Sequence, residues 1–239
     1  MRRHASYDLN VGLIVGAERC AVIDTRASLG EGTELAAAVR TITSRPGVVV
    51  NTHAHFDHFL GNAAFPGVPI WSSRRCAEAI ATSGASQRDT ATDGPDDMRA
   101  SPIVAPTDTF VTTASLDLGG RTAQLSFPGR GHTDNDIVVT VPDAAVTFAG
   151  DLVEEGAPPA FEDAYPLDWP TTLDTLIASA PAGPVVPGHG AVVDWDFVRE
   201  QRDLLARVAA AGRSCNWRDV DLPDDYAAIA RQRCAAQLG

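Results

Sequence analysis

The hydrophobic residues near the start of the chain follow first a strand period and then a helix period. Alternation across residues 10–25 predicts a β-hairpin, because the side chains of a strand point alternately to its two faces. A helix is predicted to begin at Gly32 or Thr33 and to end before Pro46-Gly47. Its apolar face is expected to consist of Leu35, Val39 and Ile42. The β-branched run Val48–Val50 that follows is typical of a buried strand.

The rest of the chain continues this mixture of strands and helices. We expect strands at 68–71 and within 109–127, a hairpin over 137–149 and a strand from 185, together with helices capped by Ser73, Asp168 and Asp194 and a last helix at 224–238. Gly84 and Gly212 are interpreted as the ends of two of these helices. Residues 83–106, rich in Ser, Thr, Asp, Gly and Pro, predict a long loop, either a lid over a site or plain surface.

Three histidines and an aspartate crowd into six residues where the strand at 48–50 ends. They are His53, His55, Asp57 and His58. Imidazoles and a carboxylate packed this closely would repel or be costly to bury unless a cation holds them. Alternation along an extended segment places His53 and His55 on one side, and the following turn directs Asp57 and His58 to a neighbouring spot. The spacing therefore predicts two adjacent groups of metal ligands.

Composition removes several classes of function. The chain has 239 residues, 31 of them acidic, and a net charge of -12 without any lysine, so all of its 19 basic residues are arginine. Such a charge disfavours nucleic acid as a partner, and the absence of lysine excludes a Schiff-base nucleophile and the P-loop lysine. No apolar run approaches membrane-spanning length and no signal-peptide core follows residues 1–8, so we expect a cytoplasmic protein without a membrane partner. Four separated cysteines are expected to be free thiols.

The remaining histidines continue the pattern, with one exception. His132 and His189 also fall at predicted strand ends, as does Asp151. His4 lies in the terminal segment, where we expect a solvated surface residue. A chain that places five of its six histidines in this way is predicted to bind metal.

Four motifs carry a resemblance to a known family. Residues 52–62 read T-H-x-H-x-D-H-x-x-G-N, residues 131–133 G-H-T, residues 150–151 G-D and residues 187–190 P-G-H-G. In this order they resemble the metallo-β-lactamase superfamily, from the first hairpin to His189, which leaves only the terminal helices outside.

The resemblance implies an α/β fold of four layers, the αββα sandwich, as a single domain over 1–239 in which the helices of 194–239 take part. It also implies a dinuclear zinc site, although iron or manganese would suit similar ligands. His53, His55 and His132 would bind the first metal, Asp57, His58 and His189 the second, and Asp151 would bridge them. A metal-stabilised hydroxide would be the nucleophile, with Asp57 orienting it or relaying its proton. Asp24 and Thr133 are candidates for fixing the orientation of the imidazoles.

The reaction expected from this resemblance is hydrolysis of a small-molecule ester, thioester, lactone or amide. Phe56, Phe161, Tyr165 and Trp169 are candidate lining residues of a substrate pocket. Three alternatives stay open: β-lactam hydrolysis as a true or promiscuous activity, an iron-dependent oxidoreductase resembling persulfide dioxygenases, and a non-catalytic binding module. The complete ligand set counts against the last of these.

Overall fold

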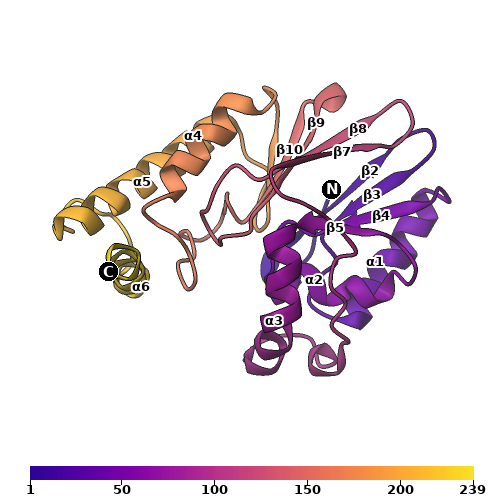
Figure 1. Cartoon of the computed structure of the whole chain (residues 1–239), viewed down its shortest axis with the longest axis horizontal. Helices are drawn as coiled ribbons and strands as arrows, with labels where there is room; N and C mark the ends of the chain where they lie inside the picture. Colours follow the sequence, from indigo (N-terminus) through magenta and orange to yellow (C-terminus); the bar gives the residue numbers. More distant parts are fainter.

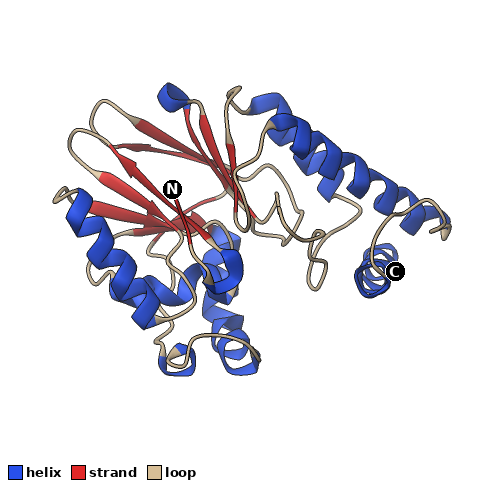
Figure 2. Ribbon diagram, turned by 180° about the vertical axis from the view of Figure 1, so that it is seen from behind, coloured by secondary structure: helices blue, strands red, loops and turns tan.

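Two β-sheets lie against each other in the middle of the molecule, and helices cover the outer face of each (Figure 1 and Figure 2). The structure is a computed structural model that describes all residues, 1–239. Fifteen buried hydrophobic residues fill the space between the two sheets. The four-layer αββα sandwich expected from the sequence is therefore confirmed.

The first sheet has six strands in the order β1-β2-β3-β4-β5-β6. Their bounds are Arg2–Arg3 (β1), Asn10–Val15 (β2), Cys20–Ile23 (β3), Gly47–Val50 (β4), Ile70–Ser73 (β5) and Asp108–Phe110 (β6). β2 and β3 form the expected antiparallel hairpin, and β3 to β6 run parallel. In β4, Val48 and Val50 face the second sheet whereas Val49 faces the helical layer, so the whole run is buried.

The second sheet has five strands in the order β11-β10-β9-β8-β7. Their bounds are Thr113–Asp117 (β7), Thr122–Ser126 (β8), Val138–Val141 (β9), Val146–Gly150 (β10) and Val185–Pro187 (β11). β7 to β10 pair antiparallel, and β11 joins β10 in parallel. The ends of β10 and β11 therefore lie side by side, which brings Asp151 close to His189.

Six α-helices form the outer layers. They are Leu29–Ile42 (α1), Phe56–Phe59 (α2), Arg74–Thr90 (α3), Trp169–Ser179 (α4), Trp195–Ser214 (α5) and Asp224–Leu238 (α6), and short 3-10 turns lie at Ser6–Asp8 (η1), Leu60–Ala64 (η2), Met98–Ala100 (η3) and Pro142–Ala144 (η4). α1 to α3 cover the first sheet, and α4 to α6 lie on the side of the second (Figure 1). None of these helices combines the length with the apolar character that crossing a membrane would need.

Three helices differ from the sequence-based prediction. α1 begins earlier, at Leu29, because the hydroxyl of Ser28 accepts a hydrogen bond from the amide of Glu31, and Ile42 at its end is 67% exposed instead of facing inward. α3 and α5 continue past the glycines that were expected to end them. Gly84 faces the ring of Phe59, and Gly212 faces Cys234 of α6, so each glycine allows close packing within a helix.

The long loop predicted over residues 83–106 is only partly a loop. Its first eight residues belong to α3, and η3 interrupts the remainder. Polar residues within helices, as in the stretch Ser83 to Thr90, are compatible with an exposed helix face, which composition alone did not reveal.

Candidate metal centre

The segment that follows β4 carries four of the candidate ligands and is fixed by the end of β3. The carboxylate of Asp24 accepts hydrogen bonds from the amide and the hydroxyl of Thr52, each 2.8 Å long. α2 starts directly afterwards at Phe56, with His55 as its N-cap residue. This short extended segment followed by a helical turn directs successive polar side chains into one buried volume.

A first group of ligand atoms comes from three loops. His53, His55, His132 and Asp151 each present one atom, and these atoms lie within 4.8 Å of one another. Nδ1 of His55 lies 2.8 Å from Nε2 of His132, and Oδ2 of Asp151 lies 3.6 Å from Nε2 of His53. The tertiary structure thus brings together the residues that the resemblance assigns to the first metal, with Asp151 among them.

A second group lies beside the first. It consists of Asp57, His58 and His189, whose ligand atoms also lie within 4.8 Å of one another. Nε2 of His58 is 3.3 Å from Nε2 of His189, and Oδ2 of Asp57 is 3.4 Å from the same His189 atom.

Asp151 lies between the two groups. Its Oδ2 is 3.5 Å from Nε2 of His132 and 3.2 Å from Nε2 of His189, while its Oδ1 is 3.3 Å from Nε2 of His58. One carboxylate therefore faces ligands of both groups, as a bridging ligand would.

Hydrogen bonds to the outer ring nitrogens determine which nitrogen of each histidine faces the centre. Nδ1 of His58 donates to Asp24 at 2.9 Å, and Nδ1 of His189 donates to the carbonyl of Tyr7 at 2.6 Å. Nε2 of His55 faces Asp163 at 3.0 Å, so in this case Nδ1 is the inward atom. Such partners orient imidazoles and fix their tautomers in metal sites.

Thr133, the second candidate for orienting an imidazole, does not contact a histidine ring through its hydrogen bonds. The amide and hydroxyl of Thr133 both donate to Asp136, at 2.7 and 2.8 Å, and shape the loop that carries His132. The carboxylate of Glu154 instead lies beside the ring of His132, with Oε1 3.1 Å from Nδ1. Sequence reasoning missed Glu154 and Asp163, because no short motif singles them out, and Tyr7, because it acts through its main chain.

The buried carboxylates and imidazoles shift each other's pKa values. Burial lowers the pKa of His53 well below its ordinary value, and His58 adds to this effect. Burial acts in the same direction on His132, but Glu154 and Asp151 outweigh it and raise its pKa to about 10. For His189, burial is likewise outweighed, chiefly by Asp151, and the pKa rises to about 9. The centre therefore attracts positive charge, whether as protons or as a metal ion.

Several buried atoms at the centre have no hydrogen-bond partner. Among them are Nε2 of His53 and Oδ1 of Asp151. Unpaired buried polar atoms are costly, and imidazole nitrogen and carboxylate oxygen are ligand types that zinc prefers. The residues present thus fit a metal ion.

A cavity of about 730 Å³ opens above the centre. His55, Asp57, His132 and Asp151 form its floor, and its walls consist of Tyr7, Phe56, Gln87, Ala160, residues 90–93 and residues 162–163. Residues 90–93 belong to the stretch that was predicted as a lid or plain surface, and they do border the site.

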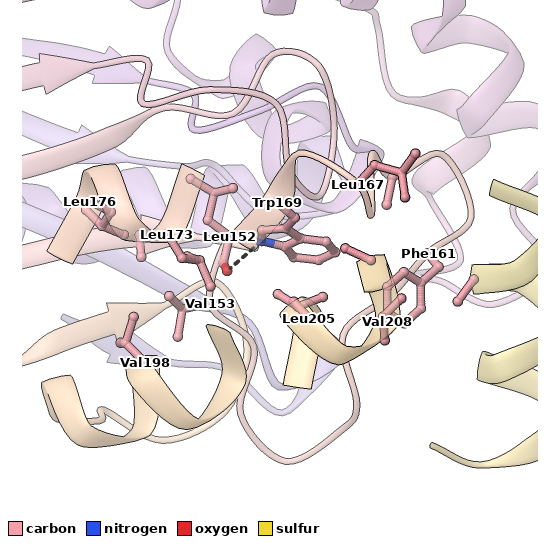
Figure 3. Close-up of a cluster of buried hydrophobic side chains, with 14 of the residues drawn as sticks. Leu152, Val153, Phe161, Leu167, Trp169, Leu173, Leu176, Val198, Leu205 and Val208 are labelled. Carbon is pink, nitrogen blue, oxygen red and sulfur yellow. Dashed lines mark hydrogen bonds between the residues drawn. The ribbon is translucent and has the colours of Figure 1, made fainter. Parts of the chain in front are cut away.

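Of the four aromatic residues proposed for the pocket, only Phe56 lines this cavity. Phe161 and Trp169 are fully buried among the side chains between the second sheet and its helices (Figure 3). Nε1 of Trp169 donates to the carbonyl of Leu152 at 3.1 Å. Tyr165 lies outside the lining, with the guanidinium of Arg130 4.5 Å from its ring centroid. The expectation was therefore wrong for these three residues, because aromatic spacing alone cannot distinguish a core position from a pocket wall.

His4 also differs from expectation. Its side chain is 8% exposed, and its Nε2 is buried without a hydrogen-bond partner. Burial, with a contribution from Arg26, lowers its pKa to about 4. His4 is thus a buried neutral residue outside the metal centre.

The fold and the site together define an αββα protein with a His/Asp cluster suited to metal. The sequence profile of the metallo-beta-lactamase superfamily matches residues 8–189. The chain belongs to the metallo-beta-lactamase superfamily, which confirms the resemblance seen in its motifs.

Curated relatives and solved structures agree with this assignment. A "Metallo-beta-lactamase type 2" of Bacillus sp. (strain 170) is 28% identical over 163 residues, which cover 66% of this chain and 56% of the relative. The chain thus spans little more than half the length of that relative. The metallo-beta-lactamase from Pontibacter korlensis superimposes with a TM-score of 0.71 at 27% identity, covering 83% of this chain and 87% of that one. The structure of TMB-1 gives a TM-score of 0.70 at 21% identity over 84% and 86% of the two chains, which supports the fold alone.

Proposed function

We propose that this protein is a dinuclear zinc hydrolase that cleaves a small ester, thioester, lactone or amide. The observation that carries the proposal is the position of Asp151, whose two oxygens face ligands of both groups. A carboxylate shared in this way suits two adjacent cations better than one.

In this proposal His53, His55 and His132 would hold one zinc, Asp57, His58 and His189 would hold the other, and Asp151 would serve both. Two zinc ions bound here would lower the pKa of a water molecule and polarise a substrate carbonyl.

The protein side chains have separate tasks. Asp57 lies at the cavity floor, where its carboxylate can orient the attacking water and accept its proton. Asp24 keeps the ring of His58 in one orientation, and the main chain at Tyr7 does the same for His189. Phe56 and Tyr7 form an aromatic side of the cavity, with ring centroids 5.5 Å apart, and limit the access of water from that side.

The test combines metal analysis with one substitution. Protein loaded with zinc is expected to contain about two ions per chain and to hydrolyse an activated thioester. Asp57→Ala is expected to abolish turnover while the circular dichroism spectrum is unchanged. Asp219→Ala, at an exposed aspartate remote from the ligands, is the matched control. Unchanged turnover in Asp57→Ala would remove the assigned mechanism, and one iron with oxygen uptake would favour the oxidoreductase alternative.

β-Lactam hydrolysis is the second candidate, because the curated relative and the solved structures carry that name. A chromogenic cephalosporin in the same screen tests it. Turnover of the cephalosporin at least as efficient as that of the thioester would favour the β-lactamase assignment.

A further inference from the structure

The walls of the cavity carry negative charge beyond what the metal centre needs. Asp93 lies on one wall, in the segment after α3, and Glu162 and Asp163 lie on the segment that precedes α4. These walls come from parts of the chain that are far apart in sequence. Their carboxylates therefore meet only in the folded protein, around the entrance to the candidate ligands.

No arginine lines this cavity, whose only basic side chains are the candidate ligands His55 and His132 at its floor. The chain has no lysine at all, so arginine is the only residue that could supply a permanent positive charge. Arg233 donates to the main-chain carbonyls of Asp163 and Ala164, both at 2.9 Å, and Arg99 donates to the carbonyl of Ala91 at 3.2 Å. These arginines support the main chain of the walls, and neither of them lines the cavity, so the walls offer no arginine to an anionic substrate.

The wall carboxylates have few partners within the protein. Asp163 faces His55 with one oxygen, and Asp93 accepts a single long hydrogen bond, 3.4 Å, from the adjacent Thr92. Glu162 is exposed and forms no ion pair. Carboxylates that the protein leaves unpaired are available to a ligand.

Charge balance at the site points in the same direction. Five carboxylates line the cavity, namely those of Asp57, Asp93, Asp151, Glu162 and Asp163. Two dications at the floor would bring four positive charges, so the cavity would stay negative. The net charge of -12 over the whole chain adds a long-range attraction for cations.

Two aromatic side chains complete the surroundings. Tyr7 and Phe56 pack edge to face at 5.5 Å and both line the cavity. The hydroxyl of Tyr7 donates to the carbonyl of Asp93, which connects the aromatic side to the acidic wall. Aromatic rings next to carboxylates are a combination that binds ammonium groups.

We infer that the cavity selects a substrate with a positively charged ammonium group attached to the ester, thioester, lactone or amide that is cleaved. This inference rests on the proposed hydrolase function and adds the substrate class to it. Asp93, Glu162 and Asp163 attract the cationic group, while the carbonyl reaches the ligands at the floor.

Three thioesters of similar size test the inference. Butyrylthiocholine carries a quaternary ammonium, S-(3,3-dimethylbutyl) thiobutyrate is its neutral isostere, and S-(2-carboxyethyl) thiobutyrate is anionic and one non-hydrogen atom smaller. With zinc-loaded protein, kcat/KM for the cationic ester is expected to exceed that for the neutral isostere by about tenfold, with the anionic ester slowest. A preference for the neutral or the anionic ester would overturn the inference, while turnover itself would leave the hydrolase proposal standing.

A double variant assigns the preference to the walls. Asp93→Asn with Glu162→Gln is expected to reduce the ratio of cationic to neutral kcat/KM by about five- to tenfold. Asp219→Asn with Glu200→Gln changes the net charge equally at exposed residues that do not line the cavity, and its ratio is expected to equal that of the wild type. If the ratio of cationic to neutral kcat/KM were the same in the wild type, the wall double variant and the control double variant, the inference would also be overturned.

A binding measurement separates the two proposals if no thioester is cleaved. In that case thioester hydrolysis is excluded from the proposed function, and calorimetric titration of choline into the zinc-loaded protein decides the inference. Binding that is weakened in Asp93→Asn with Glu162→Gln, and unchanged in the control double variant, supports a cation site. No binding of choline to the wild type overturns it.

Discussion

The carboxylate of Asp24 accepts a hydrogen bond from Nδ1 of His58 at 2.9 Å, and the same oxygen accepts the hydroxyl of Thr52 at 2.8 Å. Oγ1 of Thr52 in turn lies 3.1 Å from Nδ1 of His53. Asp24 thus supports one imidazole in each ligand group. It adopts a φ of 61°, a left-handed conformation that aspartate tolerates better than most residues.

Replacing Asp24 should therefore weaken both metal positions. Asp24→Asn is expected to reduce zinc affinity by about 10- to 100-fold, because the rings of His53 and His58 lose their fixed orientation. Competition with a chromophoric chelator measures the affinity, with Asp219→Asn as the control for lost charge. Equal affinity in the two variants would contradict the role of Asp24.

Gly188 should tolerate no side chain. A Cβ added there would lie 1.7 Å from Oδ1 of Asp151, so Gly188→Ala must displace the carboxylate that lies between the two ligand groups. We expect loss of at least one bound metal per chain, measured by mass spectrometry. Gly47→Ala is the control, since its nearest neighbour, Sγ of Cys20, is 3.6 Å away. A fully metal-loaded, active Gly188→Ala protein would show that the bridging position is unnecessary.

Zinc binding should release protons at pH 7.5. The pKa of His132 is raised to about 10 and that of His189 to about 9, and Asp151, Asp57 and Asp24 outweigh burial to hold the pKa of His58 well above its ordinary value. These three rings are therefore protonated in the metal-free protein, whereas a ligand nitrogen must be free. We expect release of roughly three protons per chain, measured by calorimetry in buffers that differ in ionisation enthalpy. The apparent zinc affinity should accordingly rise with pH up to about 10. A binding enthalpy that does not depend on the buffer would be evidence against this protonation state.

The two aromatic residues Trp169 and Phe56 should separate stability from activity. Trp169→Ala is expected to lower the free energy of unfolding by about 3–5 kcal/mol, because it empties a fully buried position and removes one of the two hydrogen bonds that the carbonyl of Leu152 accepts. Phe56→Ala, at a half-buried cavity wall, should cost about 1–2 kcal/mol and chiefly raise KM. Urea unfolding and steady-state kinetics of the two variants provide the comparison. If Trp169→Ala chiefly raised KM and Phe56→Ala chiefly lowered the free energy of unfolding, Trp169 would belong to the pocket and Phe56 to the core.

Acid should destabilise the fold through His4. Its folded pKa is about 4 against 6.5 for the ordinary side chain, so the unfolded chain binds a proton more readily than the folded one. The contribution of the neutral ring is complete above pH 6.5 and is lost as the pH falls towards 4, by up to about 3 kcal/mol. Urea unfolding at pH 7.5 and 5 should show a smaller pH dependence in His4→Gln than in the wild type. The metal centre contributes equally to the pH dependence of unfolding in the two proteins, so the difference between them isolates His4. An identical pH dependence in both would contradict the burial of His4.

Local patterns determined much of the fold and of the candidate site. The β-branched run of β4 and the hairpin of β2 and β3 follow from the pattern of hydrophobic residues, because burial on one or both faces imposes a regular spacing. The candidate ligands were recognisable because four of them lie within six residues. Asp24, which follows a predicted strand as the ligands do, could be proposed from the sequence as a residue that orients an imidazole.

Long-range packing decided the rest. Gly84 and Gly212 read locally as helix ends, yet the contacts with Phe59 and Cys234 keep both inside helices. Phe161 and Phe56 are the same residue type, and only the position of the second helical layer places one in the core and the other at the cavity. Glu154, Asp163 and the acidic wall at Asp93 meet the histidines through loops that no motif marks. Sequence determined which groups could bind a metal, because that chemistry belongs to the side chain; tertiary structure decided their outer partners and the charge of the cavity, because these depend on distances between segments that are remote along the chain.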